Sequence, residues 1–251
     1  MAHKTLISGT SYSVTGGREL IGGTGYDCKA GKTIIGGTAF TVPFSKGIPL
    51  STITPGAILY LNESGSPVPF YIAKHDYESG LNGAGRTLVV RKDCYDDRGF
   101  SGENNAFSGS TLDTWLNSTW IKLLSADIQT AAEMTKFYCL AGNGNSTKQT
   151  LIRAAFQLSV TELGKGSYND GTTLDSTVCK ILATAYRNGS TTTQWTRTPT
   201  SGTGYVGFLD RDGNLNSGSA VWGRYGSRPA FTLPATTAVT ANPDGTYTLA
   251  S

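Results

Sequence analysis

His75 and Asp76 are the residues of this chain that most directly suggest catalysis, because an adjacent acid can orient a histidine as a general base. An ordinary hydrogen bond made by a loop histidine is the simpler interpretation of the pair. No Gly-x-Ser-x-Gly elbow, His-Glu-x-x-His helix or P-loop occurs in the sequence. The sequence therefore favours a protein that is not an enzyme, and we expect no cofactor.

A second group of polar residues alternates through 210–216 and could supply oxygen ligands for calcium. An EF-hand loop starting at residue 210 would need glycine at its sixth position and glutamate at its twelfth, where Leu215 and Val221 stand. The Asp212-Gly213 pair is instead typical of a tight turn between strands. We therefore expect a turn here and no metal site.

Aromatic, arginine and polar side chains are concentrated between about residues 195 and 225. Trp and Tyr offer a large contact area at low entropic cost, and arginine adds planar hydrogen bonding, so these residue types dominate binding surfaces. Core packing is the alternative interpretation; it is favoured for Trp195, whereas Trp222 suits either role. The candidate ligand-binding residues are Trp195, Arg197, Asp210, Asp212, Asn214, Asn216, Trp222, Arg224 and Tyr225.

The N-terminal 45 residues consist of a short repeat, whose copies begin at Lys4, Arg18 and Lys32 with a period of 14. Each copy keeps a basic residue, an aliphatic pair, a Gly-Thr step and an aromatic residue in register. A repeat this short cannot enclose a core, so it must stack on its neighbours, on another chain or on a larger body. We predict two short strands per repeat and an assembly or attachment module over 1–45, with a homotrimer as the favoured oligomer.

The rest of the chain is predicted to be an α+β body over 48–233 followed by a hairpin tail over 234–251. Alternating apolar residues predict strands, and spacings of three to four residues after capping residues predict helices. The turn signal Asn242-Pro243-Asp244-Gly245 predicts the terminal hairpin. The predicted strands are 57–61, 68–73, 86–92, 154–160 and 227–233, and the predicted helices begin at Ser110, Ser125 and Ser176, the last one reaching Tyr186.

Composition argues against several classes of function. The formal net charge is +3 and no lysine- or arginine-rich run exists, which argues against nucleic-acid binding. No apolar stretch approaches the ~18 residues that span a bilayer, so we expect no membrane insertion. No apolar secretory segment is visible at the N-terminus, so we expect a protein made in a cytoplasm. The 4 scattered cysteines are predicted to be mostly buried free thiols.

Five sequence elements of the body occur in a recognisable order: residues 112–117, 156–162, 195–199, 210–214 and 225–231. Over about 50–233 this set resembles an uncharacterised domain family of gut bacteria and their phages that is related to the C-type-lectin-like fold. The Gly-Gly-Thr-x-Tyr repeats resemble those that head phage virion and tail-associated proteins. The layout is also similar to ligand-binding proteins diversified by retroelements, whose variable residues precede the closing strand, here about 195–225.

The resemblance implies a C-type-lectin-like body carried by a small all-β repeat module. It further implies a virion or tail-associated protein, located in the virion, that binds a host surface glycan or protein through 195–225 and other virion proteins through 1–45. Two alternatives remain open. One is a structural decoration or fibre protein without ligand binding. The other is an enzyme acting on surface polysaccharide, with carboxylates converging near His75, Asp76, Asp96 or Asp97.

Overall fold

The structure is a computed structural model that describes residues 47–200 and 202–250 in full and, before them, the backbone of six strands within 3–43. The chain divides into two compact units, Met1–Gly47 and Ile48–Leu249. We describe each unit separately.

Each copy of the N-terminal repeat forms one antiparallel hairpin. The hairpins pair β1 (His3–Ile7) with β2 (Thr10–Val14), β3 (Arg18–Ile21) with β4 (Thr24–Asp27), and β5 (Ala30–Ile35) with β6 (Thr38–Pro43). Cross-strand partners recur with the sequence period, in the pairs Thr5–Tyr12, Glu19–Tyr26 and Thr33–Phe40. The prediction of two strands per repeat is confirmed. An isolated two-stranded hairpin is marginally stable in water, so these hairpins need further packing partners.

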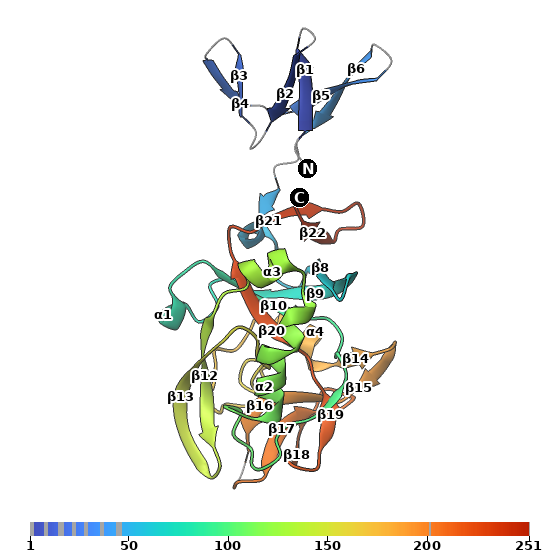
Figure 1. The fold of residues 1–251 in the computed structure, drawn as a ribbon. Coiled ribbons are helices and arrows are strands. Elements are labelled where there is room, and N and C mark those ends of the chain that lie inside the picture. The colour runs from blue at the N-terminus through green and yellow to red at the C-terminus, as the bar shows by residue number, and fades with distance from the viewer. Residues whose placement is uncertain are drawn as a thin grey trace. The chain divides into compact units, whose positions relative to one another are not determined.

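The larger unit is built on a seven-stranded sheet with the order β20-β10-β9-β8-β22-β21-β7 (Figure 1). Its strands are β7 (Ile48–Pro49), β8 (Ile58–Glu63), β9 (Ser66–Lys74), β10 (Arg86–Arg91), β20 (Ala230–Pro234), β21 (Ala238–Ala241) and β22 (Tyr247–Leu249). Ser64 and Gly65 connect β8 to β9 with φ of 54° and 82°, as a two-residue hairpin turn requires. The hairpin of β21 and β22 joins this sheet because β22 pairs in parallel with β8.

A five-stranded sheet with the order β11-β19-β16-β17-β18 forms the second layer of strands. It contains β11 (Asp97–Gly99), β16 (Gln194–Pro199), β17 (Tyr205–Leu209), β18 (Leu215–Ser219) and β19 (Arg224–Gly226). Two hairpins complete the strands: β12 (Thr135–Gly142) with β13 (Asn145–Arg153), and β14 (Ala185–Arg187) with β15 (Ser190–Thr192).

The helices are short and lie between the strands: α1 (Ser79–Asn82), α2 (Thr111–Ser118), α3 (Ala126–Ala131) and α4 (Ser176–Ala183). The N-cap predicted at Ser110 is confirmed, because its hydroxyl accepts a hydrogen bond from Asp113 N at 3.0 Å. The helix predicted to reach Tyr186 ends earlier, since the Gln194 side-chain amide donates to the carbonyl oxygens of Leu182 and Ala183 and β14 then begins.

The strand predicted over 154–160 is wrong, although the segment is buried. Only one β-bridge, Phe156 to Ala230, occurs in it, and no named strand covers these described residues. Its backbone groups are bonded by side chains instead: Ser159 N donates to the Glu162 carboxylate and Val160 N donates to the Thr198 hydroxyl. These side-chain partners satisfy the buried backbone without a ladder.

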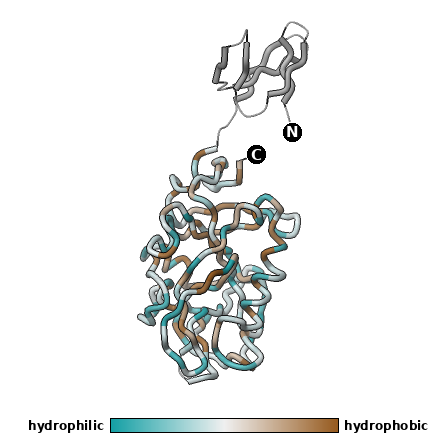
Figure 2. The backbone as a smooth tube through the Cα atoms, turned by 60° about the vertical axis from the view of Figure 1, so that its left-hand side comes forward, coloured by the Kyte–Doolittle hydropathy of each residue, from teal (hydrophilic) through white to brown (hydrophobic). Residues whose placement is uncertain are grey.

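Buried aromatic residues connect the two sheets into one core, and hydrophobic segments run through the middle of the unit in Figure 2. Phe70, Trp120 and Phe231 pack on the seven-stranded sheet, while Phe100, Trp195 and Phe208 pack on the five-stranded sheet. Strands dominate, with a few helices between them, so the predicted α+β class is confirmed. Within the described residues, no helix is long and apolar enough to cross a membrane.

Cys94, Cys139 and Cys179 are free thiols, while Cys28 lies outside the described residues. Burial raises the pKa of Cys94 to about 11 and that of Cys139 to about 12. At pH 8 a thiol with a pKa near 11 is ionised in about one molecule in a thousand, and only the thiolate reacts with alkylating reagents.

We therefore expect iodoacetamide at pH 8 to label the half-buried Cys179 first and to leave Cys94 and Cys139 intact until the protein is unfolded. Peptide mass spectrometry of the C28S variant measures this order. Fast labelling of Cys94 or Cys139 in the folded protein would contradict the burial described.

Candidate functional site

Two of the predicted ligand-binding residues, Trp195 and Arg197, lie inside the core. Both are on β16, whose six residues are all buried. Trp195 is 1% exposed, and its indole N–H donates to the Arg98 carbonyl oxygen at 2.8 Å, whereas Arg197 has no exposed surface. The prediction that they contact a ligand is therefore corrected: β16 is an inner strand of its sheet and is covered on both faces, so these side chains support the fold.

Arg197 is bonded to a carboxylate and to three backbone carbonyls. Its guanidinium forms a two-bond ion pair with Glu162, at 2.6 and 2.8 Å, and donates to the carbonyl oxygens of Tyr138, Gln157 and Asp170. Tyr77 donates its hydroxyl to the same carboxylate at 2.5 Å. Burial lowers the pKa of Arg197, but the neighbouring Glu162 outweighs this and raises it overall. Neither Arg197 nor Glu162 has any exposed surface, so the cluster supports the fold from inside the core.

Residues 210–214 form a tight turn, as predicted, and β18 begins at Leu215. The Asp210 carboxylate accepts hydrogen bonds from the backbone N–H groups of Asp212 and Asn214, at 3.0 and 2.9 Å. These bonds lower the pKa of Asp210. Gly213 has a φ of 79°, and a Cβ there would lie 3.1 Å from the Ala183 carbonyl oxygen. Asp212, Asn214 and Asn216 are exposed. The carboxylate of Asp210 thus bonds to the backbone of the turn.

The remaining predicted residues lie at the other end of the β17–β18 hairpin. Leu209 pairs with Leu215 beside the 210–214 turn, and Tyr205 pairs with Ser219 at the opposite end, just before Trp222 and Arg224. Each strand has five residues, so the two ends are ~13 Å apart. The structure therefore does not gather the predicted residues into one site; the exposed aromatic and arginine are at one end and the polar turn is at the other.

Trp222 is 85% exposed, although its backbone is firmly held. Its own N–H donates to the Ser219 hydroxyl at 3.2 Å, and the next residue, Gly223, donates to the Ser219 carbonyl at 2.8 Å. A Cβ on Gly223 would lie 2.6 Å from that carbonyl oxygen and 3.0 Å from the Trp195 ring, so this loop rests directly on the core. Nearby, half-buried Tyr225 stacks on Phe208 with a centroid distance of 4.1 Å. The loop displays Trp222 on a rigid base.

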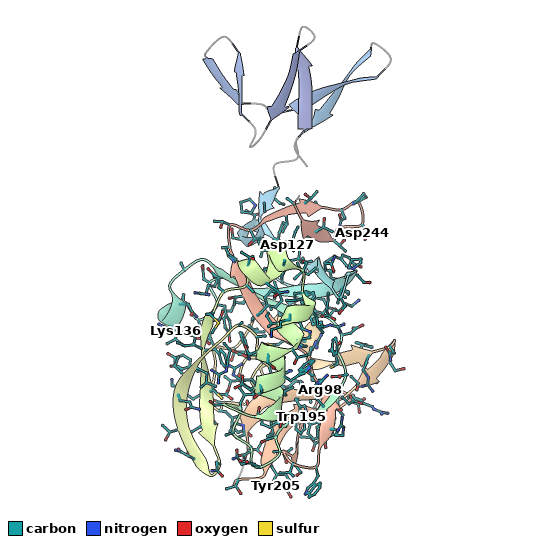
Figure 3. The ribbon with its side chains drawn as sticks, viewed as in Figure 1. Arg98, Asp127, Lys136, Trp195, Tyr205 and Asp244 are labelled. Carbon is teal, nitrogen blue, oxygen red and sulfur yellow. The ribbon has the colours of Figure 1, made fainter. Side chains whose placement is uncertain are left out.

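Arg224 opens onto a groove of about 270 Å³ that the sequence did not indicate. The groove is lined by Arg98, Gly99, Ser101, Gly102, Thr111, Trp115 and Arg224. Arg98 stacks over the Trp115 ring, 3.6 Å from its centroid. A second hollow of about 280 Å³ shares Ser101, Gly102 and Thr111 with it. Figure 3 shows Arg98 beside Trp195 in the part of the body that contains β16, β17 and β19.

Two ion pairs involve β11, which contributes Arg98 to the groove, and the residue before it. Arg98 pairs with Asp96 at 2.8 Å, and Arg187 pairs with Asp97 at 2.7 Å. Burial raises the pKa of Asp96, with Arg98 acting in the opposite direction. Arg224 is exposed and donates to the Asp97 carbonyl oxygen at 3.4 Å, and none of the ion pairs found in the described residues includes it. The groove thus has a free arginine beside one that is already held in place.

His75 has a structural role in the described part of the chain. One ring nitrogen lies 2.9 Å from the Thr87 hydroxyl, and the other lies 2.7 Å from the Ile53 carbonyl oxygen, so Nε2 carries the proton that it donates there. Asp76 accepts a hydrogen bond from Gly85 N instead of facing His75. Among the described residues, no group of three or more His, Cys, Asp or Glu side chains is arranged to hold a metal ion.

Arg98 and Trp115 are the site residues that sequence reasoning missed. Trp115 is a half-buried residue of α2 that lines the groove. The two side chains meet because α2 packs beside β11, a contact that no local pattern predicts. By contrast, the buried Arg228 has a structural role, since it donates to the carbonyl oxygens of Arg91, Lys92 and Leu182.

Comparison with known proteins gives one result. No curated protein and no solved structure matches this chain. A family model described as a domain of unknown function (DUF6273) matches residues 84–235, a range that contains the groove, the Trp222 loop and the Arg197–Glu162 ion pair. Because the matched range covers more than half of the 251 residues, the chain belongs to the DUF6273 family.

Proposed function

We propose that this protein is a phage virion or tail-associated protein whose body binds a host surface ligand, a glycan or a protein, without a covalent step. The binding face comprises Trp222, Arg224 and the adjacent groove. The repeat module is proposed to attach the protein to other virion proteins as a homo-oligomer, with a trimer favoured, and the body is proposed to have a C-type-lectin-like fold. Display of several copies on one particle would raise a weak affinity by avidity.

The observation that carries the proposal is Trp222. A tryptophan that is 85% exposed contributes little to the core, yet the loop that holds it is bonded to Ser219 and packed on Trp195. Tryptophan and arginine are the residues most enriched among those that dominate binding energy. A loop ordered in advance loses less conformational entropy when a ligand binds. A rigidly displayed tryptophan beside an unpaired arginine is what a recognition surface requires.

The phage context is supported by the sequence resemblance described above. The 14-residue repeats are similar to those that head virion and tail-associated proteins, and each forms a hairpin too small to be stable by itself. Attachment to other virion components supplies the missing packing surface.

Replacing Trp222 with alanine is expected to weaken ligand binding at least thirtyfold, the effect of losing a hot-spot residue worth ~2 kcal/mol. The full chain is first screened on a glycan array and against intact bacterial cells, and Trp222→Ala is then titrated on whichever target binds. Stability should change by no more than about 0.5 kcal/mol, because the side chain is exposed.

Met134→Ala is the matched control, since Met134 is also an exposed large apolar residue (56%) and lies between α3 and β12. It should bind as the unmodified chain does. Equal binding by Trp222→Ala and the unmodified chain would overturn the proposed binding face. Receptor binding would be overturned if the protein did not bind cells and if free protein did not block the binding of intact particles to cells. The protein would then be a structural decoration protein of the virion.

A further inference from the structure

We propose that the groove lined by Arg98, Trp115 and Arg224 binds an anionic sugar, that is, a saccharide bearing a carboxylate or a phosphate. The inference rests on the proposed function, because it names the ligand class of the same face. It is carried by the charges, the shape and the lining of the groove.

The charge of the groove favours an anion. Arg98 and Arg224 line the groove; Arg98 is paired with Asp96, whereas none of the ion pairs found in the described residues includes Arg224. A guanidinium presents paired N–H donors that match the oxygens of a carboxylate or a phosphate. The groove therefore offers donors that an oxyanion would satisfy.

Arg98 is held in place before any ligand arrives. Its guanidinium is fixed between the Trp115 ring, 3.6 Å from the ring centroid, and the Asp96 carboxylate at 2.8 Å. Tyr95 in turn packs on Trp115 with a centroid distance of 5.4 Å. Because these contacts already restrict its rotamers, binding to Arg98 costs little side-chain entropy.

The size and lining of the hollows favour a sugar. At about 270 and 280 Å³, each is below the ~300–1,000 Å³ of sites for drug-sized ligands and suits a single small ring. Ser101 and Thr111, whose side chains carry hydroxyls, line both hollows; the lining of the first hollow is otherwise mainly apolar and that of the second mainly polar. Glu103 lines only the second hollow, which places the anionic group at the Arg98–Arg224 end.

Gly102 keeps the groove open and gives a direct test. A Cβ there would meet nothing within 4 Å, and the backbone has an ordinary φ, so Gly102→Leu fills the groove without straining the fold. Gly80 on α1 is the matched control, because it also has free space and an ordinary φ. In Figure 1, α1 and β19 lie on opposite sides of the body.

The full chain is titrated with D-glucuronate, glucose 6-phosphate, glucose and inorganic phosphate by ligand-observed NMR and calorimetry. We expect at least one anionic sugar to bind at least tenfold more tightly than glucose and than inorganic phosphate. The two anionic probes distinguish a carboxylate from a phosphate ligand. Gly102→Leu should abolish binding and Arg224→Ala should weaken it at least tenfold. Gly80→Leu and Arg211→Ala, which removes an exposed arginine from the 210–213 turn, should have no effect.

Binding of glucose as tight as that of both anionic sugars, full binding by Gly102→Leu, or binding of inorganic phosphate as tight as that of any sugar would each overturn the inference. Two results would distinguish a failure of the anionic-sugar groove from a failure of receptor binding. Cell or glycan-array binding that needs Trp222 but is unchanged by Gly102→Leu would overturn the anionic-sugar groove and leave receptor binding intact. Binding of glucuronate by a protein that engages no cell or glycan target would uphold the groove and overturn receptor binding.

Discussion

Replacing Arg197 with methionine is expected to lower the free energy of unfolding by about 3–5 kcal/mol, the usual cost of removing one partner of a buried ion pair. The replacement leaves the Glu162 carboxylate buried without its cation, in a region where neither side chain is exposed. It also removes the donors to the carbonyl oxygens of Tyr138, Gln157 and Asp170. These carbonyls belong to segments far apart in the chain, so one side chain connects them all.

Denaturant titration of the full chain, followed by tryptophan fluorescence, measures the change in free energy. Arg187→Met is the control: Arg187 also forms an ion pair, with Asp97, but its side chain is 32% exposed, so its loss should cost at most about 1 kcal/mol. The double variant Arg197→Met/Glu162→Met should recover part of the stability, because it removes the stranded charge. A loss of less than 1 kcal/mol for Arg197→Met would show that the cluster does not support the fold.

Replacing Trp120 with alanine is expected to cost about 3–5 kcal/mol as well, for a different reason. The ring has no exposed surface and packs against Phe70 and Phe231 at centroid distances of 6.5 and 6.0 Å, so its removal leaves a large cavity. Its indole N–H also donates to the Glu63 carboxylate at 3.2 Å, and that carboxylate binds Arg91.

Trp120→Phe separates the two contributions, since it keeps an aromatic ring in the core and removes only the N–H donor. We expect it to cost about 1–2 kcal/mol, the value of a hydrogen bond to a charged group plus a small packing loss. Unfolding is followed by circular dichroism, because the substitution removes a fluorescent residue. A Trp120→Ala variant as stable as Trp120→Phe would exclude cavity formation as the main effect.

The sequence predicted those parts of the fold that depend on local signals. Ser110, followed by Asp113 and an apolar face, marks the start of α2, and the 14-residue period predicts the three hairpins. The residue pattern of 154–160 predicts a strand, but the segment is irregular because its backbone is bonded by Glu162 and by Thr198, which is distant in sequence. The end of α4 was misplaced because Gln194, from another element, binds its last carbonyls.

The positions of the candidate site residues also depend on contacts that local sequence patterns do not predict. Trp195 and Trp222 look alike in sequence, and they differ in the structure because one is on an inner strand and the other follows a hairpin end. Arg197 is buried because a carboxylate distant in sequence pairs with it, and the groove exists because α2 packs beside β11. Residue types indicated the kind of surface to expect, whereas their positions depended on contacts between segments far apart in the chain.

The place of the last hairpin in the seven-stranded sheet has a topological consequence. Val239 on β21 pairs with Ile48 on one side and with Leu249 on the other. The first and last residues of the body are therefore separated by two strand spacings, roughly 10 Å, a gap that three or four linker residues can close. Since both ends meet in one sheet, the body is suited to circular permutation and to insertion as a unit into a loop of another protein. We therefore expect the body to keep its fold when the order of its segments along the chain is changed.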